Sequence, residues 1–209
     1  MKILIADDHA IVREGVKLIV KTLPEVKQID EAADGKEALA KLIKNHYDLA
    51  ILDISMPEIT GLDLLQQIKI HNIDTRVLML SFHPQEQYAV RAFKLGAAGY
   101  LSKDSAFEEM GMAIRKIAAG GKYVSAAFAE KLLFNEVSST DQQLHESLSD
   151  REFQVMIMLA KGKSVSEIAS IIFISDKTVA TYRARIMEKM QMKKNAELTI
   201  YALRNKLIE

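Results

Sequence analysis

The stretch Leu49–Pro57 (LAILDISMP) decides the expected fold of the first half of the chain. Its first four residues, Leu49–Leu52, are all apolar, and an aspartate, Asp53, follows at once before a proline-containing turn. A short continuous apolar run that ends in turn residues is typical of a strand buried on both faces. Such strands occur in parallel sheets that helices cover on both sides. We therefore expect Leu49–Leu52 to be a central strand with Asp53 at its carboxyl end.

Similar short runs lie before and after this strand. They predict strands over Ile3–Ala6, Val26–Asp30, Val77–Leu80 and Gly99–Leu101. Between the strands, apolar residues recur at helical spacing, in the sets Ile11, Gly15, Leu18, Ile19; Ala38, Leu39, Leu42, Ile43; Leu62, Leu65, Ile68; Ala89, Val90, Phe93; and Met112, Ile114, Ile117. Five such βα repeats predict an α/β domain, a doubly wound five-stranded parallel sheet with helices on both faces. Right-handed crossovers favour the strand order 2-1-3-4-5.

The pattern changes near residue 145, after which no strand-like alternation occurs. Four helical segments follow, namely Asp150–Lys161, Val165–Ile172, Lys177–Met190 and Ala196–Lys206. Ser149 and Glu152 form a capping-box pattern before the first of them, and Gly162 is expected to end it. The polar stretch Asn135–Ser147 indicates a linker, and Ala126–Phe134 can form one extra helix before it. We expect the α/β domain over 1–121, a linker over 122–145 and an all-α four-helix domain over 146–209.

Composition excludes several classes of protein. The 209 residues include no cysteine, which excludes a disulfide scaffold, a thiolate nucleophile and a thiolate zinc site. No stretch approaches the roughly 18 uncharged apolar residues of a membrane span, and two aspartates interrupt the N-terminal apolar run too early for a secretion signal. We therefore expect a cytoplasmic protein without a membrane segment. The 28 basic and 28 acidic residues balance, with residues 1–144 at −3 and 145–209 at +3, too little to diagnose DNA binding.

Polar residues follow the expected strands at one edge of the sheet, where ligands of open α/β sheets bind. These residues are Asp7, Asp8, Asp53, Ser81 and Lys103. Three neighbouring carboxylates repel one another and need a cation or raised pKa values, and oxygen ligands suit Mg²⁺. The set permits nucleophilic attack by Asp53 on a phosphoryl group, which gives an aspartyl phosphate. Lys103 and Ser81 can then contact the phosphoryl oxygens.

These residues, together with Asp53–Pro57, Gly61 and Gly96–Lys103, resemble the receiver domain of bacterial two-component response regulators. The resemblance covers about residues 1–120 and implies a flavodoxin-like fold. It implies that a sensor histidine kinase phosphorylates Asp53.

The same resemblance implies a magnesium site and a switch. Asp8, Asp53 and the backbone carbonyl of Ser55 would bind Mg²⁺, with Asp7 nearby. Ser81 and Tyr100 would form the switch pair, in which the hydroxyl moves toward the phosphoryl group and the aromatic ring turns inward.

Two residues depart from the usual pattern of this family, and a third argues against the alternative of a hydrolase. Phe82 stands where the family usually has a small residue, and its ring is expected to restrict access to Asp53 or to alter the switch. Asp104 stands where many receivers have a proline after a cis bond, which leaves the geometry of that bond open. Ser55 stands where an aspartyl-phosphate hydrolase would need a second carboxylate. We therefore expect no standalone enzyme, only self-catalysed phosphoryl transfer and slow autodephosphorylation at Asp53.

The helical half contains a helix-turn-helix pattern, in which Ile174–Asp176 is a turn into the segment Lys177–Met190. Val179, Ile186 and Met190 share one face and should pack inward. The opposite face combines small residues with groups that bind phosphates and base edges. The expected DNA contacts are Lys177, Thr178, Thr181, Tyr182, Arg183 and Arg185.

This half resembles the LuxR-type helix-turn-helix over residues 146–209. The matching residues are Leu148–Glu152, Val155, Leu159, Gly162, Glu167–Ala169, Ile174–Ser175 and Lys177–Val179. The whole chain thus resembles the NarL/FixJ class of response regulators, in which double-stranded DNA is the partner and the active form is a homodimer. The last helix, Asn195–Lys206, would make the dimer contact, with Leu198, Tyr201 and Ala202 as candidates.

Two alternatives remain open at this point. One is a protein-interaction module, in which the helical domain docks to a protein partner instead of DNA. Ala180 stands where many members have a lysine that contacts DNA, so Thr181, Arg183 and Arg185 would carry more of a DNA contact. Phe82 leaves room for an atypical regulator that binds DNA without phosphorylation.

Overall fold

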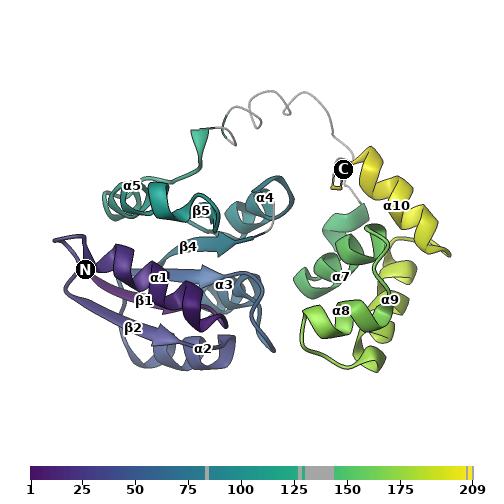
Figure 1. Cartoon of the computed structure of the whole chain (residues 1–209), viewed down its shortest axis with the longest axis horizontal. Coiled ribbons are helices and arrows are strands. Elements are labelled where there is room, and N and C mark those ends of the chain that lie inside the picture. Colours follow the sequence, from purple (N-terminus) through teal and green to yellow (C-terminus); the bar gives the residue numbers. More distant parts are fainter. Residues whose placement is uncertain (83–84, 127–128, 130–143, 206, 209) are drawn as a thin grey trace. The chain divides into compact units, whose positions relative to one another are not determined.

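The computed structural model divides the chain into two units, Met1–Glu136 and Val137–Glu209 (Figure 1). It describes residues 1–82, 85–126, 129, 144–205 and 207–208. The extra helix expected over Ala126–Phe134 lies outside the described residues, apart from Ala126 and Ala129. Within the described part, every helix is too short or too polar to cross a membrane.

A five-stranded parallel sheet forms the first unit, and its order β2-β1-β3-β4-β5 confirms the expected topology. The strands are β1 (Lys2–Ala6), β2 (Gln28–Ala32), β3 (Leu49–Asp53), β4 (Arg76–Ser81) and β5 (Gly99–Ser102). All five residues of the central β3 are buried, as a continuous apolar run predicts. In the register, Ile51 of β3 lies beside Ile5 of β1 and Leu78 of β4, so the carboxyl ends of the strands meet at one edge.

Helices cover both faces of this sheet. They are α1 (Ala10–Lys21), α2 (Gly35–Lys44), α3 (Gly61–Ile70), α4 (Gln85–Leu95) and α5 (Ala106–Ala118). Helices α1 and α5 pack together over one core cluster, while α3 packs between α2 and α4. Thr60 and Asp63 form a capping box at the start of α3, which fixes the loop that follows β3.

Two expectations about this unit were wrong in detail. Strand β2 begins at Gln28, two residues later than expected. Val26 does not join the strand because its amide donates a hydrogen bond to the carbonyl oxygen of Leu23 in the preceding turn. On α1, Ile11 and Leu18 are 89% and 63% exposed. The buried residues of this helix are Val16 and Val20, and Ile19 of the expected set is partly buried against the same core cluster, so the apolar spacing located only part of the side that packs on the sheet.

The two edges of the sheet are protected in different ways. Edge strand β2 carries charged residues, and Lys2 of β1 pairs with its Asp30 at 3.2 Å. Beside the other edge strand, β5, Tyr123 makes two backbone hydrogen bonds. Its amide donates to Ala98 at 2.9 Å, and its carbonyl oxygen accepts from Tyr100 at 3.2 Å.

The second unit is helical. It contains the short 3-10 helix η1 (Leu144–Ser147) and α7 (Asp150–Ala160), α8 (Val165–Ile171), α9 (Asp176–Lys189) and α10 (Asn195–Arg204). Helix α7 contacts each of the other three, and its residues from Glu152 to its end are all buried. The expected capping box of Ser149 and Glu152 is present, and Gly162 adopts φ +82°, the left-handed conformation that follows a helix end.

Candidate functional site

The carboxyl edge of the sheet brings together the polar residues that follow the strands. Asp7 follows β1, Asp53 and Ser81 end β3 and β4, and Lys103 follows β5. Asp7 and Asp53 are each 2% exposed and Lys103 is 6% exposed, so the charges lie inside the protein. Buried charges are stable only when they are paired or bind an ion.

Lys103 pairs with two carboxylates at once. Its Nζ lies 2.7 Å from Asp7 Oδ2 and 3.0 Å from Asp53 Oδ1. The Lys103 amide donates to the carbonyl oxygen of Ser81 at 2.7 Å, which ties the lysine to the end of β4. The bond between Lys103 and Asp104 is trans, as are all peptide bonds of the described residues.

Asp8 and His9 complete the acidic cluster. One ligand atom from each of Asp7, Asp8, His9 and Asp53 lies within 4.8 Å of all the others. His9 Nδ1 is 2.7 Å from Asp8 Oδ1, and the His9 amide donates to Asp7 Oδ1 at 2.8 Å. The cluster therefore offers mainly carboxylate oxygen atoms, the ligands that hard divalent cations prefer.

Asp53 has the properties of a nucleophile and of a cation ligand. Its pKa is raised from 3.8 to about 6, mainly by burial and also by the charges of Asp7 and Asp8, while Lys103 opposes the shift. Its Oδ2 is buried and has no hydrogen-bond partner among the described residues. A bound cation would satisfy this oxygen and stabilise the ionised form, so the site fits a divalent metal ion.

Ser81 and Tyr100 lie beside this cluster. Both are buried, and a side-chain hydrogen bond joins them. Burial also raises the pKa of the Tyr100 hydroxyl. The ring therefore already occupies an inward position. Ser55, the other residue expected here, is half-buried in the loop after β3.

Two further side chains contact the cluster. The ring of Phe82 lies over Lys103, with 4.8 Å between Nζ and the ring centroid. Arg13 of α1 donates to the carbonyl oxygen of Asp7 at 2.7 Å and pairs with Glu31 of β2 at 3.2 Å. Arg13 therefore holds the loop between β1 and α1. Sequence reasoning missed it because nothing distinguishes it there from a surface arginine.

In the second unit, α9 has one exposed polar row. Lys177, Thr181 and Arg185 are exposed and lie about one turn apart, with the small exposed residues Ala180 and Ala184 between them. We call Lys177, Thr181 and Arg185 the α9 row. As expected, Val179, Ile186 and Met190 are buried on the opposite side of the helix.

The other three expected DNA contacts are half-buried. The Thr178 amide donates to the helix cap Ser175 at 3.1 Å, and the hydroxyl groups of these two residues are 2.8 Å apart. Arg183 Nε donates to Asn195 Oδ1 of α10 at 2.9 Å. Thr178 and Arg183 thus already make hydrogen bonds within the domain, and Tyr182 is only partly accessible. All three are therefore weaker candidates for DNA contacts than the residues of the α9 row.

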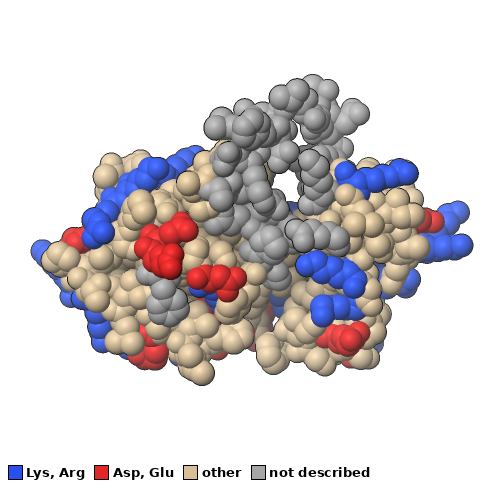
Figure 2. Space-filling view, turned by 45° about the horizontal axis from the view of Figure 1, so that its top comes forward, with Lys and Arg blue, Asp and Glu red and all other residues tan. Residues whose placement is uncertain are grey.

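Basic residues dominate the described surface of this unit, and Figure 2 shows several of them on the visible face. The exposed basic residues are Lys161, Lys163, Lys177, Arg185, Lys189, Lys193, Lys194 and Arg204. The exposed acidic residues are Glu167, Asp176, Glu188 and Glu197. This excess of positive charge suits a polyanion.

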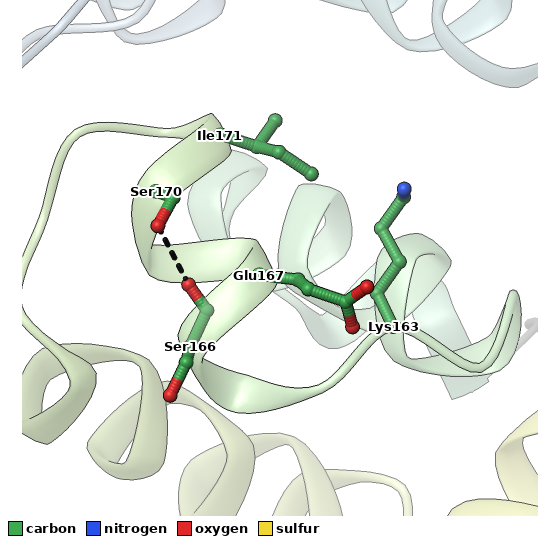
Figure 3. Close-up of a pocket in the computed structure, with 5 residues that line it drawn as sticks. All are labelled: Lys163, Ser166, Glu167, Ser170 and Ile171. Atoms are coloured by element: carbon green, nitrogen blue, oxygen red, sulfur yellow. Dashed lines mark hydrogen bonds between the residues drawn. The ribbon is translucent and has the colours of Figure 1, made fainter.

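Helix α8 carries an open depression of about 390 Å³ (Figure 3). Lys163 and Glu167 line one side of it, and the Ser170 hydroxyl donates to the carbonyl oxygen of Ser166 at 3.0 Å. The Ser166 hydroxyl also donates to Asp176 Oδ2 at 2.5 Å, which joins α8 to the first residue of α9.

Two of the expected dimer contacts on α10 are wrong. Leu198 and Ala202 are each 0% exposed because they pack into the domain core. Tyr201 is half-buried, and its hydroxyl lies 2.8 Å from His145 Nδ1. The exposed large apolar residues of this helix are Ile200 and Leu203.

Family models match both units. Residues 3–115 match the response regulator receiver domain, and residues 146–202 match the bacterial regulatory proteins of the luxR family. The chain therefore belongs to the response regulators, in the NarL/FixJ class that joins a receiver domain to a LuxR-type DNA-binding domain.

Individual relatives agree with this class. The chain is 34% identical to the response regulator UvrY of Escherichia coli over 208 residues, which cover 99% of this chain and 95% of the relative. It is 37% identical to the oxygen regulatory protein NreC of Staphylococcus epidermidis, with both chains fully covered. The response regulator RcsB of Salmonella typhimurium has the same fold, with a TM-score of 0.62 at 24% identity over 96% of this chain and 98% of that one.

Proposed function

We propose that this response regulator is switched by phosphorylation of Asp53, and that a sensor histidine kinase is the donor. The observation that carries the proposal is the buried convergence of Asp7, Asp53 and Lys103 at the carboxyl edge, in a chain that also presents the α9 row. Asp8, Asp53 and the carbonyl group of Ser55 would hold Mg²⁺, with Asp7 beside them. When bound, the ion would neutralise charge on the phosphoryl oxygens.

The chain's own groups perform the transfer. The unpaired Oδ2 of Asp53 attacks phosphorus, the bond from phosphorus to the donor nitrogen breaks, and the imidazole takes the electron pair. A pKa of about 6 leaves most of the Asp53 carboxyl ionised at pH 7. Lys103, already 3.0 Å from Asp53, moves to a phosphoryl oxygen. Ser55 stands two residues after Asp53, where a hydrolase of this kind would need a carboxylate to activate water, so the aspartyl phosphate is lost slowly.

The switch couples this reaction to the α9 row. The Ser81 hydroxyl exchanges its bond with Tyr100 for a bond to the new phosphoryl group, which leaves the Tyr100 ring to repack. Double-stranded DNA is the partner of the α9 row, since its cations suit phosphates and Arg185 suits a base edge. Ile200 and Leu203, exposed on α10, replace Leu198 and Ala202 as contacts of an active homodimer.

Phosphorylation is tested on the full chain with acetyl phosphate and Mg²⁺. We expect one acid-labile phosphoryl group, seen by mass and by retardation on a phosphate-affinity gel, and none on Asp53→Asn. Labelling of Asp53→Asn at the wild-type level would refute the assignment.

DNA binding is then measured with duplexes enriched from a random pool. Tighter binding by the phosphorylated chain supports the switch. Equal binding by both forms would favour a regulator that acts without phosphorylation, and no enrichment would favour a protein-interaction module.

A further inference from the structure

Phe82 is in contact with the phosphoacceptor site, yet the transfer described above gives it no role. It directly follows Ser81 at the end of β4, and it is 59% exposed. Its ring lies over Lys103 Nζ, 4.8 Å from the centroid. The side chain of Lys103 itself is only 3% exposed. The ring of Phe82 therefore stands between this ammonium group and solvent.

This position matters because Lys103 Nζ marks where phosphoryl oxygens will lie. The Nζ is 3.0 Å from the nucleophilic carboxylate, so a phosphoryl group on Asp53 comes within reach of it. A ring over Lys103 is then a neighbour of that phosphoryl group. An aromatic face attracts the ammonium, most strongly where water is excluded, which keeps the ring in place.

Hydrolysis of the aspartyl phosphate requires a water molecule on the solvent side of the phosphoryl group, opposite the Asp53 oxygen that leaves. The water oxygen forms a bond to phosphorus as the bond from phosphorus to the Asp53 oxygen breaks. The Asp53 carboxylate takes the electron pair, and the water protons pass to the released phosphate and to solvent. Space filled by an aromatic ring is lost to the attacking water.

We propose that Phe82 covers the phosphoacceptor pocket and prolongs the lifetime of phosphorylated Asp53 by excluding water beside Lys103. This inference rests on the proposed function, because it assumes that Asp53 carries the phosphoryl group. In this inference the rate at which the aspartyl phosphate is hydrolysed depends on the Phe82 side chain as well as on the acidic cluster. Phe82 acts through Lys103 and the solvent, so it is a positioning residue.

The test follows the decay of the phosphoryl group on the full chain. The protein is labelled with acetyl phosphate and Mg²⁺, the donor is removed, and the labelled fraction is followed on phosphate-affinity gels. Phe82→Ala should lose the group about fivefold faster, which corresponds to about 1 kcal/mol of barrier. Phe82→Trp keeps an aromatic cover and should decay at the wild-type rate. Phe173→Ala removes another exposed phenylalanine, 72% accessible in the second unit, and is the matched control.

Thermal melting of each variant checks that the fold is kept. Decay of Phe82→Ala at the wild-type rate would overturn the inference, and so would failure of Phe82→Trp to restore the slow rate. Either result would leave the proposed function standing. If the wild-type chain takes no label, or Asp53→Asn takes as much, the proposed function fails instead.

Discussion

The first unit buries the charges of Asp7, Asp53 and Lys103, whereas the α9 row of the second unit leaves its charges in solvent. At the cluster, each charge depends on its neighbours, since Lys103 bridges Asp7 and Asp53. In the α9 row, Lys177 and Arg185 stand apart and are screened by salt. Chemistry on a phosphoryl group needs the first arrangement, and recognition of a polyanion needs only the second.

The largest effect is expected when the ammonium group of Lys103, which pairs with both Asp7 and Asp53, is removed. Lys103→Met leaves Asp7 and Asp53 buried without their partner, so the free energy of unfolding at pH 7.5 without Mg²⁺ should fall by about 3–5 kcal/mol. Denaturant titration measures this change. Lys21→Met, at an exposed lysine of α1, should cost less than about 0.5 kcal/mol. Equal losses in the two variants would contradict the buried coupling.

The second test concerns the α9 row. Lys177→Ala and Arg185→Ala should each weaken binding to an enriched duplex about tenfold, which is about 1.4 kcal/mol. For a lost phosphate contact, the slope of log affinity against log salt should fall by about 1. Arg183→Ala is the comparison, since Arg183 Nε already bonds to Asn195. Its effect on DNA should be smaller, and an effect as large as that of Arg185→Ala would contradict the division of this helix.

The smallest expected effect is the number of protons released when Mg²⁺ binds. Asp53 has a pKa of about 6 without metal, so Mg²⁺ binding at pH 6 should release about half a proton, and almost none at pH 8. Because this pKa lies above its ordinary value of 3.8, Asp53 lowers stability progressively as the pH rises from about 4 to 6. Calorimetry in two buffers measures the release. Asp53→Asn should show none at either pH, and equal wild-type release at both would contradict the raised pKa.

The architecture of the sheet was predictable because periodicity and topology act together. Buried strands such as β3 are continuous apolar runs, and short right-handed crossovers restrict their order. The inner side of α1 was predictable only in part, since Ile19 packs on the core as its spacing suggests. Ile11 and Leu18 have helical spacing, yet packing against α5 selects Val16 and Val20 instead. One helix offers two apolar stripes, and only tertiary contacts choose between them.

At the candidate site, the sequence located the side chains that lie at the carboxyl ends of the strands. It missed the side chains whose role is to bind a backbone carbonyl group. Asp53 and Lys103 follow from topology, whereas Arg13 acts on the carbonyl oxygen of Asp7, which no side-chain pattern encodes. The same limit applies to the second unit. Leu198 and Ala202 match an apolar face of α10, but that face packs into the domain and Ile200 and Leu203 remain outside.

The two protected edges of the sheet also restrict how copies of this protein can associate. Charged residues line β2, and Tyr123 occupies backbone groups beside β5. Within the described residues, neither edge presents an apolar, open hydrogen-bonding ladder to another chain. Intermolecular strand addition is therefore disfavoured, and with it the growth of sheets into fibres. Contacts of the first unit with other proteins would therefore use its helices and loops rather than its strand edges.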